Sequence, residues 1–204
     1  TMEVLIRKPR NQQEYEEKIQ FCISEVDRLN HMVDQLLLLA RFENQKQNVK
    51  QETIYLNALV LDNLTRFSEK SEAKKLKIKT HFSDDYYLLS DNYLVSIIIS
   101  NLISNAIKYS NSNGEIAIQL EKTNEEVIFS ITDNGIGIAE NDLNKIFNSF
   151  YRSDVSNHPE IKGTGLGLSI VKRLCDLLKI KILVESKINE KTSFILIFSL
   201  ANLK

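Results

Sequence analysis

The sequence predicts an α+β sandwich, in which a mostly antiparallel sheet carries helices on one face and one long helix of the bundle or coiled-coil type precedes it. Three observations support this prediction. Apolar residues repeat at helical spacing along residues 11–42, residues 43–52 are almost wholly polar, and the rest of the chain mixes helical and strand patterns joined by short turns.

The composition excludes several classes of partner. The 204 residues include 26 Lys and Arg against 27 Asp and Glu, scattered rather than blocked, so neither nucleic acid nor an anionic membrane surface is expected as a partner. Cys22 and Cys175 are too few and too far apart for a disulfide framework or a metal knuckle, which favours a reducing cytoplasmic setting. No apolar run reaches the roughly 18 residues of a membrane helix. The start of the chain reads like the middle of a helix rather than a signal peptide.

The long helix is predicted from its seam. Residues 2–8 are expected to be helical up to Pro9, and Asn11 can cap a new helix with Glu14 completing a capping box. Apolar residues then alternate spacings of four and three: Tyr15, Ile19, Cys22, Val26, Leu29, Val33, Leu36 and Ala40. This repeat specifies a coiled-coil or bundle seam. An ordinary core helix is the alternative, but a length of about 33 residues disfavours it.

The polar segment 43–52 predicts a domain boundary, with residues 1–47 in one part and 48–204 in the other. Beyond it the patterns predict, in order, a strand at 53–55, a helix at 56–73, strands at 76–82 and 86–89, a helix at 91–109, strands at 115–121 and 126–133, a helix at 165–178, and strands at 180–185 and 193–199. Short turns between successive strands, such as residues 122–125, imply antiparallel pairing.

The glycines form the first candidate site. Five of the six lie in two clusters, and the first cluster follows the strand that ends at Asp133. Strand periodicity places Asp133 on the same apolar face as Phe129 and Ile131, where a carboxylate is costly unless a donor reaches it. A nucleotide base with an amino group is such a donor. Capping of its own Asn-Gly turn explains Asp133 equally well at this point.

The second glycine cluster, residues 162–170, opens directly into a helix. Flexible backbone at a helix N-terminus offers free N–H groups and a positive dipole end, which suits phosphate. No Gly-Lys-Ser/Thr follows, so the cluster is not a Walker motif, and no strand leads into it as a dinucleotide fingerprint requires.

Two further segments bring polar groups. Asn101, Asn105 and Lys108 share one face of the predicted helix 91–109, and amide oxygens suit Mg²⁺. A solvated face is the alternative, which the apolar neighbours disfavour. In the segment 146–152, aromatic residues precede Arg152, whose guanidinium could reach phosphate, and residues 153–162 resemble a mobile lid. A surface loop over an aromatic cluster remains the alternative there.

Together these segments resemble the sensor histidine kinases of two-component systems. Residues 101–110 (NLISNAIKYS) resemble the family's N box, 133–138 (DNGIGI) its G1 box, 147–152 (FNSFYR) its F box and 163–168 (GTGLGL) its G2 box. The match spans residues 53–199. The helix ending at residues 36–43 resembles the second helix of the dimerisation and phosphotransfer hairpin.

The resemblance implies the Bergerat fold, shared with the chaperone, gyrase and mismatch-repair ATPases, with ATP and Mg²⁺ as ligands. Asn105 would coordinate Mg²⁺ beside Asn101, while Lys108 and Arg152 would contact phosphates. Asn101, Lys108 and Arg152 are the catalytic residues on this reading, because phosphoryl transfer needs mainly positioning and charge neutralisation.

At the base end, the resemblance makes Asp133 the acceptor for the adenine amino group and Tyr109 a wall of the site. Gly135 and Gly137 would give the base room, and the backbone from Gly163 to Gly167 would close over the phosphates. The other nucleotide contacts that it implies are Ile138, Tyr151, Thr164, Gly165, Leu166 and Leu168.

The sequence departs from the family in two places. His31, His81 and His158 all lack the context of the phosphoacceptor, so the chain is expected to be a fragment of a longer sensor that begins just past that histidine. The family's glycines near the last two strands are replaced at residues 178–181 and 189–192. These are expected to be wall positions of the site, which predicts altered loops rather than lost binding.

The expected partners are a second copy or the full-length kinase through the hairpin, and a response regulator. The chain would be the cytoplasmic part of a membrane-anchored sensor, with the membrane reached only through upstream segments. Two alternatives remain: a non-catalytic, nucleotide-regulated interaction module, and another ATPase of the same superfamily.

Overall fold

The computed structural model describes residues 11–43, 49–123, 125–153 and 163–200, and it divides the chain into two compact units, Thr1–Lys46 and Gln47–Lys204. No helix within these described ranges is long and apolar enough to cross a bilayer. The helix predicted at residues 2–8 lies outside the described residues.

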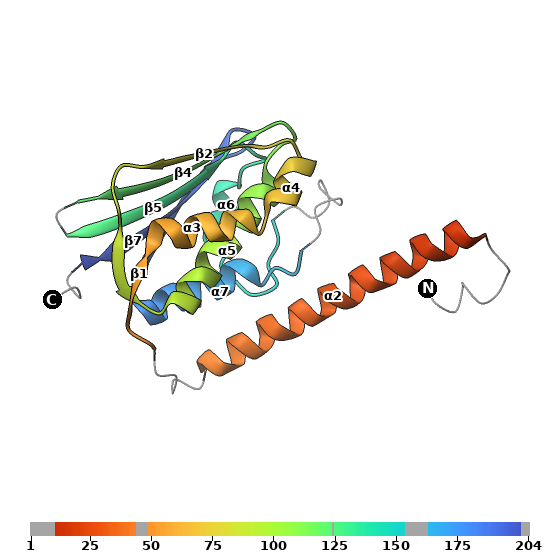
Figure 1. The fold of residues 1–204 in the computed structure, drawn as a ribbon, viewed down its shortest axis with the longest axis horizontal. Helices are drawn as coiled ribbons and strands as arrows, with labels where there is room; N and C mark the ends of the chain where they lie inside the picture. The colour runs from red at the N-terminus through yellow and green to blue at the C-terminus, as the bar shows by residue number, and fades with distance from the viewer. Residues whose placement is uncertain (1–10, 44–48, 124, 154–162, 201–204) are drawn as a thin grey trace. The chain divides into compact units, whose positions relative to one another are not determined.

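The first unit is described as one helix, α2, which spans Gln12–Glu43 and is labelled in Figure 1. The side-chain oxygen of Asn11 accepts a 2.8 Å hydrogen bond from the Glu14 amide, which confirms Asn11 as the predicted cap. Large apolar side chains along this helix are about half exposed: Ile19, Phe21, Ile23, Val26, Leu29, Val33 and Leu37. An apolar stripe of this kind is typical of a helix that packs in a bundle.

The second unit is built on a five-stranded sheet with the strand order β2-β4-β5-β7-β6 (Figure 1). Its strands are β2 (Lys77–Phe82), β4 (Glu115–Lys122), β5 (Glu126–Asp133), β6 (Lys181–Lys187) and β7 (Lys191–Ser199). Every neighbouring pair is antiparallel except β2 and β4, which run parallel. β1 (Glu52–Tyr55) and β3 (Tyr87–Ser90) form a separate antiparallel pair.

Helices cover one face of the large sheet. α3 (Leu56–Thr65), α5 (Asn92–Tyr109) and α7 (Gly167–Leu178) lie on that face in Figure 1, and α4 (Ser68–Ala73) and α6 (Glu140–Leu143) are short. Leu102 of α5 and Phe129 of β5 are fully buried in the layer between helices and sheet. The predicted α+β sandwich, with helices on one face of a mostly antiparallel sheet, is therefore confirmed.

The prediction of one helix over residues 56–73 is wrong, because α3 ends at Thr65 and α4 begins at Ser68. The Ser68 hydroxyl donates a 2.9 Å hydrogen bond to the Thr65 carbonyl. In a continuous helix, that carbonyl would instead accept a backbone amide of the next turn. α7 begins at Gly167 rather than at residue 165, because Gly165 has a φ of +74° that no right-handed helix accommodates. Helix α6 falls in a stretch for which no helix was predicted.

Candidate functional site

A cavity of about 340 Å³ opens between the helices and the end of the sheet. It is lined by Asn105, Tyr109, Asp133, Ile136, Gly137, Ile138, Ala139, Asp142, Ile146, Tyr151, Arg152, Ser153, Leu168, Ile188, Asn189, Thr192 and Phe194. The cavity thus gathers residues from α5, the end of β5, the turn after it, α6, the segment beyond α6, the start of α7 and the β6–β7 turn. An apolar hollow with a few convergent polar groups is the usual form of a small-ligand site.

Asp133 is the most unusual group in this cavity. It is the last residue of β5, and alternation along the strand turns it inward with Phe129 and Ile131, as the sequence predicts. Its exposed fraction is 4 %, and within the described part of the chain no group meets hydrogen-bond geometry at Oδ1. Burial raises the pKa of Asp133 from 3.8 to about 7, which the Gly135 amide and Lys74 offset only in part.

The turn after Asp133 packs against the end of α5. The Ile136 amide donates a 3.2 Å hydrogen bond to the Tyr109 carbonyl, and a Cβ at Gly135 would collide with that same oxygen. Gly137 has a φ of +71°, and a Cβ there would collide with the carbonyl of Lys187. Both glycines are therefore required by close backbone approach, so the turn needs no ligand to explain its glycines.

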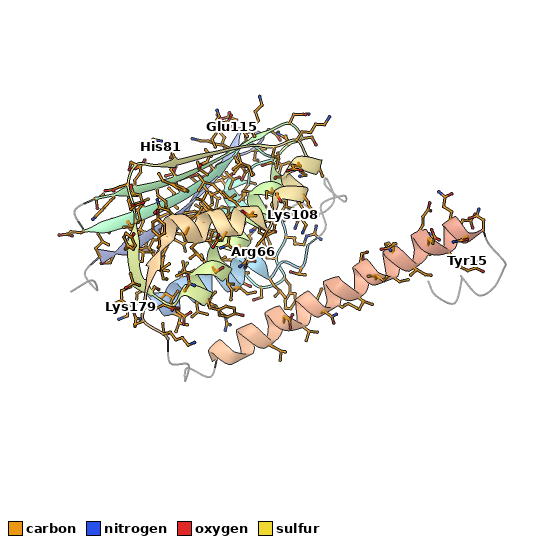
Figure 2. All side chains as sticks on the ribbon, in the orientation of Figure 1. Tyr15, Arg66, His81, Lys108, Glu115 and Lys179 are labelled. Atoms are coloured by element: carbon orange, nitrogen blue, oxygen red, sulfur yellow. The ribbon has the colours of Figure 1, made fainter. Side chains whose placement is uncertain are left out.

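The helix α5 contributes two residues to the cavity wall, Asn105 and Tyr109. Lys108 is labelled in Figure 2, and its ammonium donates a 3.2 Å hydrogen bond to the Tyr109 hydroxyl. Asn101 lies outside the cavity wall: its amide donates to the Ile97 carbonyl over 2.9 Å, and its Oδ1 would lie 2.8 Å from a Cβ at Gly167. Asn101 therefore faces the second glycine cluster, whereas Lys108 lies between that cluster and Tyr109.

The segment beyond α6 is tied to that helix by one carboxylate. Asp142 accepts hydrogen bonds from the Tyr151 hydroxyl at 2.7 Å and from the Ser153 hydroxyl at 2.5 Å. These two bonds hold the pKa of Asp142 below its usual range. Arg152 lies between the two hydroxyls in sequence and lines the cavity, close enough to Tyr109 to lower its burial-raised pKa in part. Of the predicted lid at 153–162, only Ser153 is among the described residues.

The second glycine cluster leads into α7 and packs against the same segment. The Phe150 amide donates a 2.9 Å hydrogen bond to the Gly165 carbonyl, and a Cβ at Gly165 would lie 2.7 Å from the Phe150 carbonyl carbon. A Cβ at Gly163 would collide with Lys108 Nζ. Leu168 lines the cavity, whereas Gly163, Thr164, Gly165, Leu166 and Gly167 lie beside it rather than in its wall.

Sequence reasoning expected wall positions at residues 189–192 without giving any of them a role, and it expected wall positions at residues 178–181 as well, which do not line this cavity. Thr192 lies opposite Asp133 in the sheet, and its hydroxyl shares a 2.8 Å hydrogen bond with the Ser186 hydroxyl. Asn189 takes a φ of 58° and donates its amide to the Ile136 carbonyl over 2.9 Å. Asn189 thus adopts a left-handed backbone at the place where the resembled family often has a glycine-rich turn, and Asn tolerates this conformation better than most residues. Only the strand register could have placed Thr192 beside Asp133.

The chemistry of this wall fits an adenine nucleotide. The buried Asp133 carboxylate in the cavity wall suits a donor such as an aromatic amine, and the cavity volume suits a small molecule. Arg152 supplies a permanent positive charge toward a phosphate. The described residues contain no cluster of three His, Cys, Asp or Glu side chains that could hold a metal ion. A metal at this site would therefore depend on the Asn105 amide and on ligand phosphates, as Mg²⁺ commonly does.

Comparisons with known proteins agree with the geometry. The family described as "Histidine kinase-, DNA gyrase B-, and HSP90-like ATPase" matches residues 90–202. Sensor protein RprX of Bacteroides fragilis is 33 % identical over 84 % of this chain and 34 % of its own length. Sensor protein kinase GraS of Staphylococcus aureus is 32 % identical over 98 % of this chain and 56 % of its own length. The chain thus spans about a third to about half the length of these curated relatives.

Solved structures show the same architecture. The histidine kinase AdeS of Acinetobacter baumannii superposes with a TM-score of 0.79 at 26 % identity, over 98 % of this chain and 90 % of that one. The catalytic domain of the histidine kinase ThkA, in a nucleotide-free form, gives a TM-score of 0.65 at 28 % identity, over 74 % of this chain and 97 % of that one. The chain therefore belongs to the histidine kinase-, DNA gyrase B- and HSP90-like ATPase family, among its sensor histidine kinases.

Proposed function

We propose that this chain binds Mg·ATP in the cavity and transfers the γ-phosphoryl group to a histidine of a sensor kinase hairpin in two-component signal transduction. In the reaction, the bond between the γ-phosphorus and the oxygen bridging to the β-phosphate breaks. A phosphorus–nitrogen bond to the imidazole forms, ADP leaves with the bridging oxygen, and the imidazole proton passes to water.

The proposal rests above all on Asp133. A buried carboxylate in a cavity wall costs free energy unless a ligand completes its hydrogen bonds, and the Gly135 amide offsets that cost only in part. The amino group of adenine would donate to the Asp133 carboxylate, whereas guanine presents a carbonyl oxygen at the corresponding position and would be repelled by it. Asp133 would thereby select adenine over guanine nucleotides.

The other end of the cavity suits a triphosphate. Lys108 and Arg152 would neutralise its charge, and the amides of the segment from Gly163 to Gly167 would lie over it at the start of α7. Asn105 would give one oxygen to Mg²⁺, whose positive charge would stabilise the charge that develops on the transferred group. The chain's own residues then mainly position the phosphoryl group and exclude water.

The acceptor histidine is proposed to lie outside this chain. His81 is an exposed residue of β2, on the sheet and away from the cavity wall (Figure 2). His31 lies within α2, and His158 lies outside the described residues. None of the three precedes the acidic residue that follows the family's acceptor.

Two measurements test the proposal. Isothermal titration of a non-hydrolysable ATP analogue with Mg²⁺ should give saturable binding that Asp133→Asn weakens at least about tenfold, while the matched control Asp62→Asn on the exposed face of α3 leaves it unchanged. Radiolabelled ATP should then label a separate protein that carries the first hairpin helix with its histidine. Binding without transfer would favour the interaction module, and no binding at millimolar nucleotide would refute both.

The same proposal extends to the remaining parts and partners. Residues 1–47 would be the end of the first helix and the second helix of the hairpin, and residues 48–204 the catalytic ATP-binding domain. The half-exposed stripe of α2 would pair with a second copy or with the full-length kinase. A response regulator would take the phosphoryl group from the histidine, and upstream segments would anchor the sensor to the membrane with this part in the cytoplasm.

A further inference from the structure

Lys74 ends α4 and reaches across to the C-terminus of α5. Its ammonium donates hydrogen bonds to the carbonyls of Ile107 at 3.0 Å, Lys108 at 2.7 Å and Ser110 at 3.1 Å. An ammonium has three N–H donors, and these three bonds match that number. One side chain from another helix thus caps the last turn of the helix that carries Tyr109.

This cap accounts for carbonyls that α5 cannot satisfy itself, because the carbonyls of a helix's last turn have no partner within the helix. The Ala106 carbonyl accepts from the Ser110 amide at 3.0 Å and from the Ser110 hydroxyl at 2.6 Å. Lys74 takes the next two carbonyls, those of Ile107 and Lys108. The last carbonyl, that of Tyr109, accepts the Ile136 amide at 3.2 Å.

The turn that holds Asp133 is therefore docked on a helix end that Lys74 keeps in place. Besides the Ile136 bond, Ser110 forms an antiparallel bridge with Gly135, and the Gly135 Cα lies too close to the Tyr109 carbonyl for any side chain. A shift in the last turn of α5 must move Gly135 and Ile136, and with them the carboxylate two residues before Gly135.

The backbone of Lys74 is itself fixed. The Asn113 amide donates to its carbonyl over 2.9 Å, and the Leu76 amide closes the end of α4 by donating to the Ser71 carbonyl over 2.9 Å. Lys75 takes the left-handed conformation with a φ of 55°, as the residue after a helix commonly does. The ammonium is thus held in position at modest cost in side-chain entropy, and its charge complements the negative end of the α5 dipole.

We propose that Lys74 is a positioning residue for nucleotide base recognition, which sets the distance between the Asp133 carboxylate and the wall formed by Tyr109. The inference deepens the proposed function and rests on it. Electrostatics act in the same direction, because the charge of Lys74 lowers the pKa of Asp133 and so favours the ionised acceptor that an amine requires.

The test compares Lys74→Met with the control Lys77→Met, a neighbouring exposed lysine of β2, by measuring affinities for adenosine, ADP and Mg·ATP. Lys74→Met should weaken all three by a similar factor of roughly tenfold, because the loss is at the base end, and Lys77→Met should weaken none. Lys74→Arg, which keeps the charge and donors, should restore part of the affinity. Amide hydrogen exchange at Ile136 should accelerate in Lys74→Met without any nucleotide present.

The outcomes separate the two proposals. If the unaltered protein binds no adenosine, the proposed function fails at the base site. If it binds adenosine and a folded Lys74→Met binds equally well, or loses affinity only for Mg·ATP, the role of Lys74 is overturned while the function stands. Should Lys74→Met unfold, Lys74→Gln, which keeps two N–H donors, decides: weakened adenosine binding with faster Ile136 exchange supports the role, and unchanged values overturn it.

Discussion

The Tyr151 hydroxyl donates a 2.7 Å hydrogen bond to the Asp142 carboxylate, which also accepts the Ser153 hydroxyl and so ties the cavity segment on either side of Arg152 to α6. Each of these bonds is charge-assisted, and together they hold the chain on both sides of Arg152, which lines the cavity. Sequence reasoning selected Tyr151 and Arg152 for the site but overlooked Asp142, which binds the first of them and holds the chain beside the second.

Asp142→Ala should weaken Mg·ATP binding about fivefold while leaving adenosine affinity unchanged, because the proposed function has Arg152 contact the triphosphate rather than the base. Titration calorimetry with both ligands measures the difference. Glu140→Ala, an exposed acidic residue of the same short helix, is the matched control. In a double-mutant cycle, Tyr151→Phe should add little to Asp142→Ala. Fully additive effects would show that the two residues act separately.

Asp133→Asn should stabilise the nucleotide-free protein at alkaline pH. Because the folded-state pKa of Asp133 is raised from 3.8 to about 7, the folded protein retains a proton that the unfolded chain has lost, and its stability falls as the pH rises through that window. The penalty above pH 7 is at most about 4 kcal/mol. In thermal melts, the Tm should fall less from pH 5 to pH 8 for Asp133→Asn than for the unaltered protein. If the Tm of the two proteins changed with pH in parallel, burial of the ionised Asp133 carboxylate would not destabilise the fold.

Asn105→Ala should remove the effect of Mg²⁺ on ATP affinity and leave adenosine affinity unchanged. Asn105 lines the cavity, and its amide oxygen is the protein ligand that the proposed function assigns to Mg²⁺. Titrations with ATP in Mg²⁺ and in EDTA measure the effect directly. Asn92→Ala, an exposed residue at the start of the same helix, should behave like the unaltered protein. If Mg²⁺ still changed the ATP affinity of Asn105→Ala, a group other than Asn105 would be the metal ligand.

Gly165→Ala and Gly163→Ala should differ, although both add one methyl group to the same cluster. At Gly165 the new Cβ would lie 2.7 Å from backbone of Phe150 at a φ of +74°, so the free energy of unfolding should fall by about 1–3 kcal/mol. At Gly163 the new Cβ meets only the flexible end of Lys108, which can move aside. Chemical denaturation measures both. Equal destabilisation would mean that backbone approach is not what requires Gly165.

The apolar stripe of α2 should drive self-association. Light scattering of the chain should show a concentration-dependent dimer, and replacing Val26 and Val33, both about half exposed, with Glu should shift it to monomer. Nucleotide affinity should not change in that variant, because the cavity lies wholly within Gln47–Lys204. A strict monomer at high concentration would argue against the helix as a dimerisation surface.

The sequence by itself determined the class of fold and much of the site. Alternation along β5 placed Asp133 inward, the paired glycines marked the two turns, and the seam and the Asn11 cap identified the long helix. These features are local: each depends on a period, a cap or a backbone angle that a few neighbouring residues fix. For the same reason the break at residues 66–67 was missed, because competing hydrogen bonds of single hydroxyl groups carry little periodic signal.

Only the tertiary structure decided which distant residues meet. Thr192 lies beside Asp133 through strand register, Asp142 fastens the segment around Arg152, and Lys74 caps a helix that begins 18 residues after it. It also placed Asn101 and most of the second glycine cluster beside the cavity rather than in its wall. Such contacts arise where packed helices and strands end near one another, and side-chain bonds across those ends depend on that packing rather than on any local pattern in the chain.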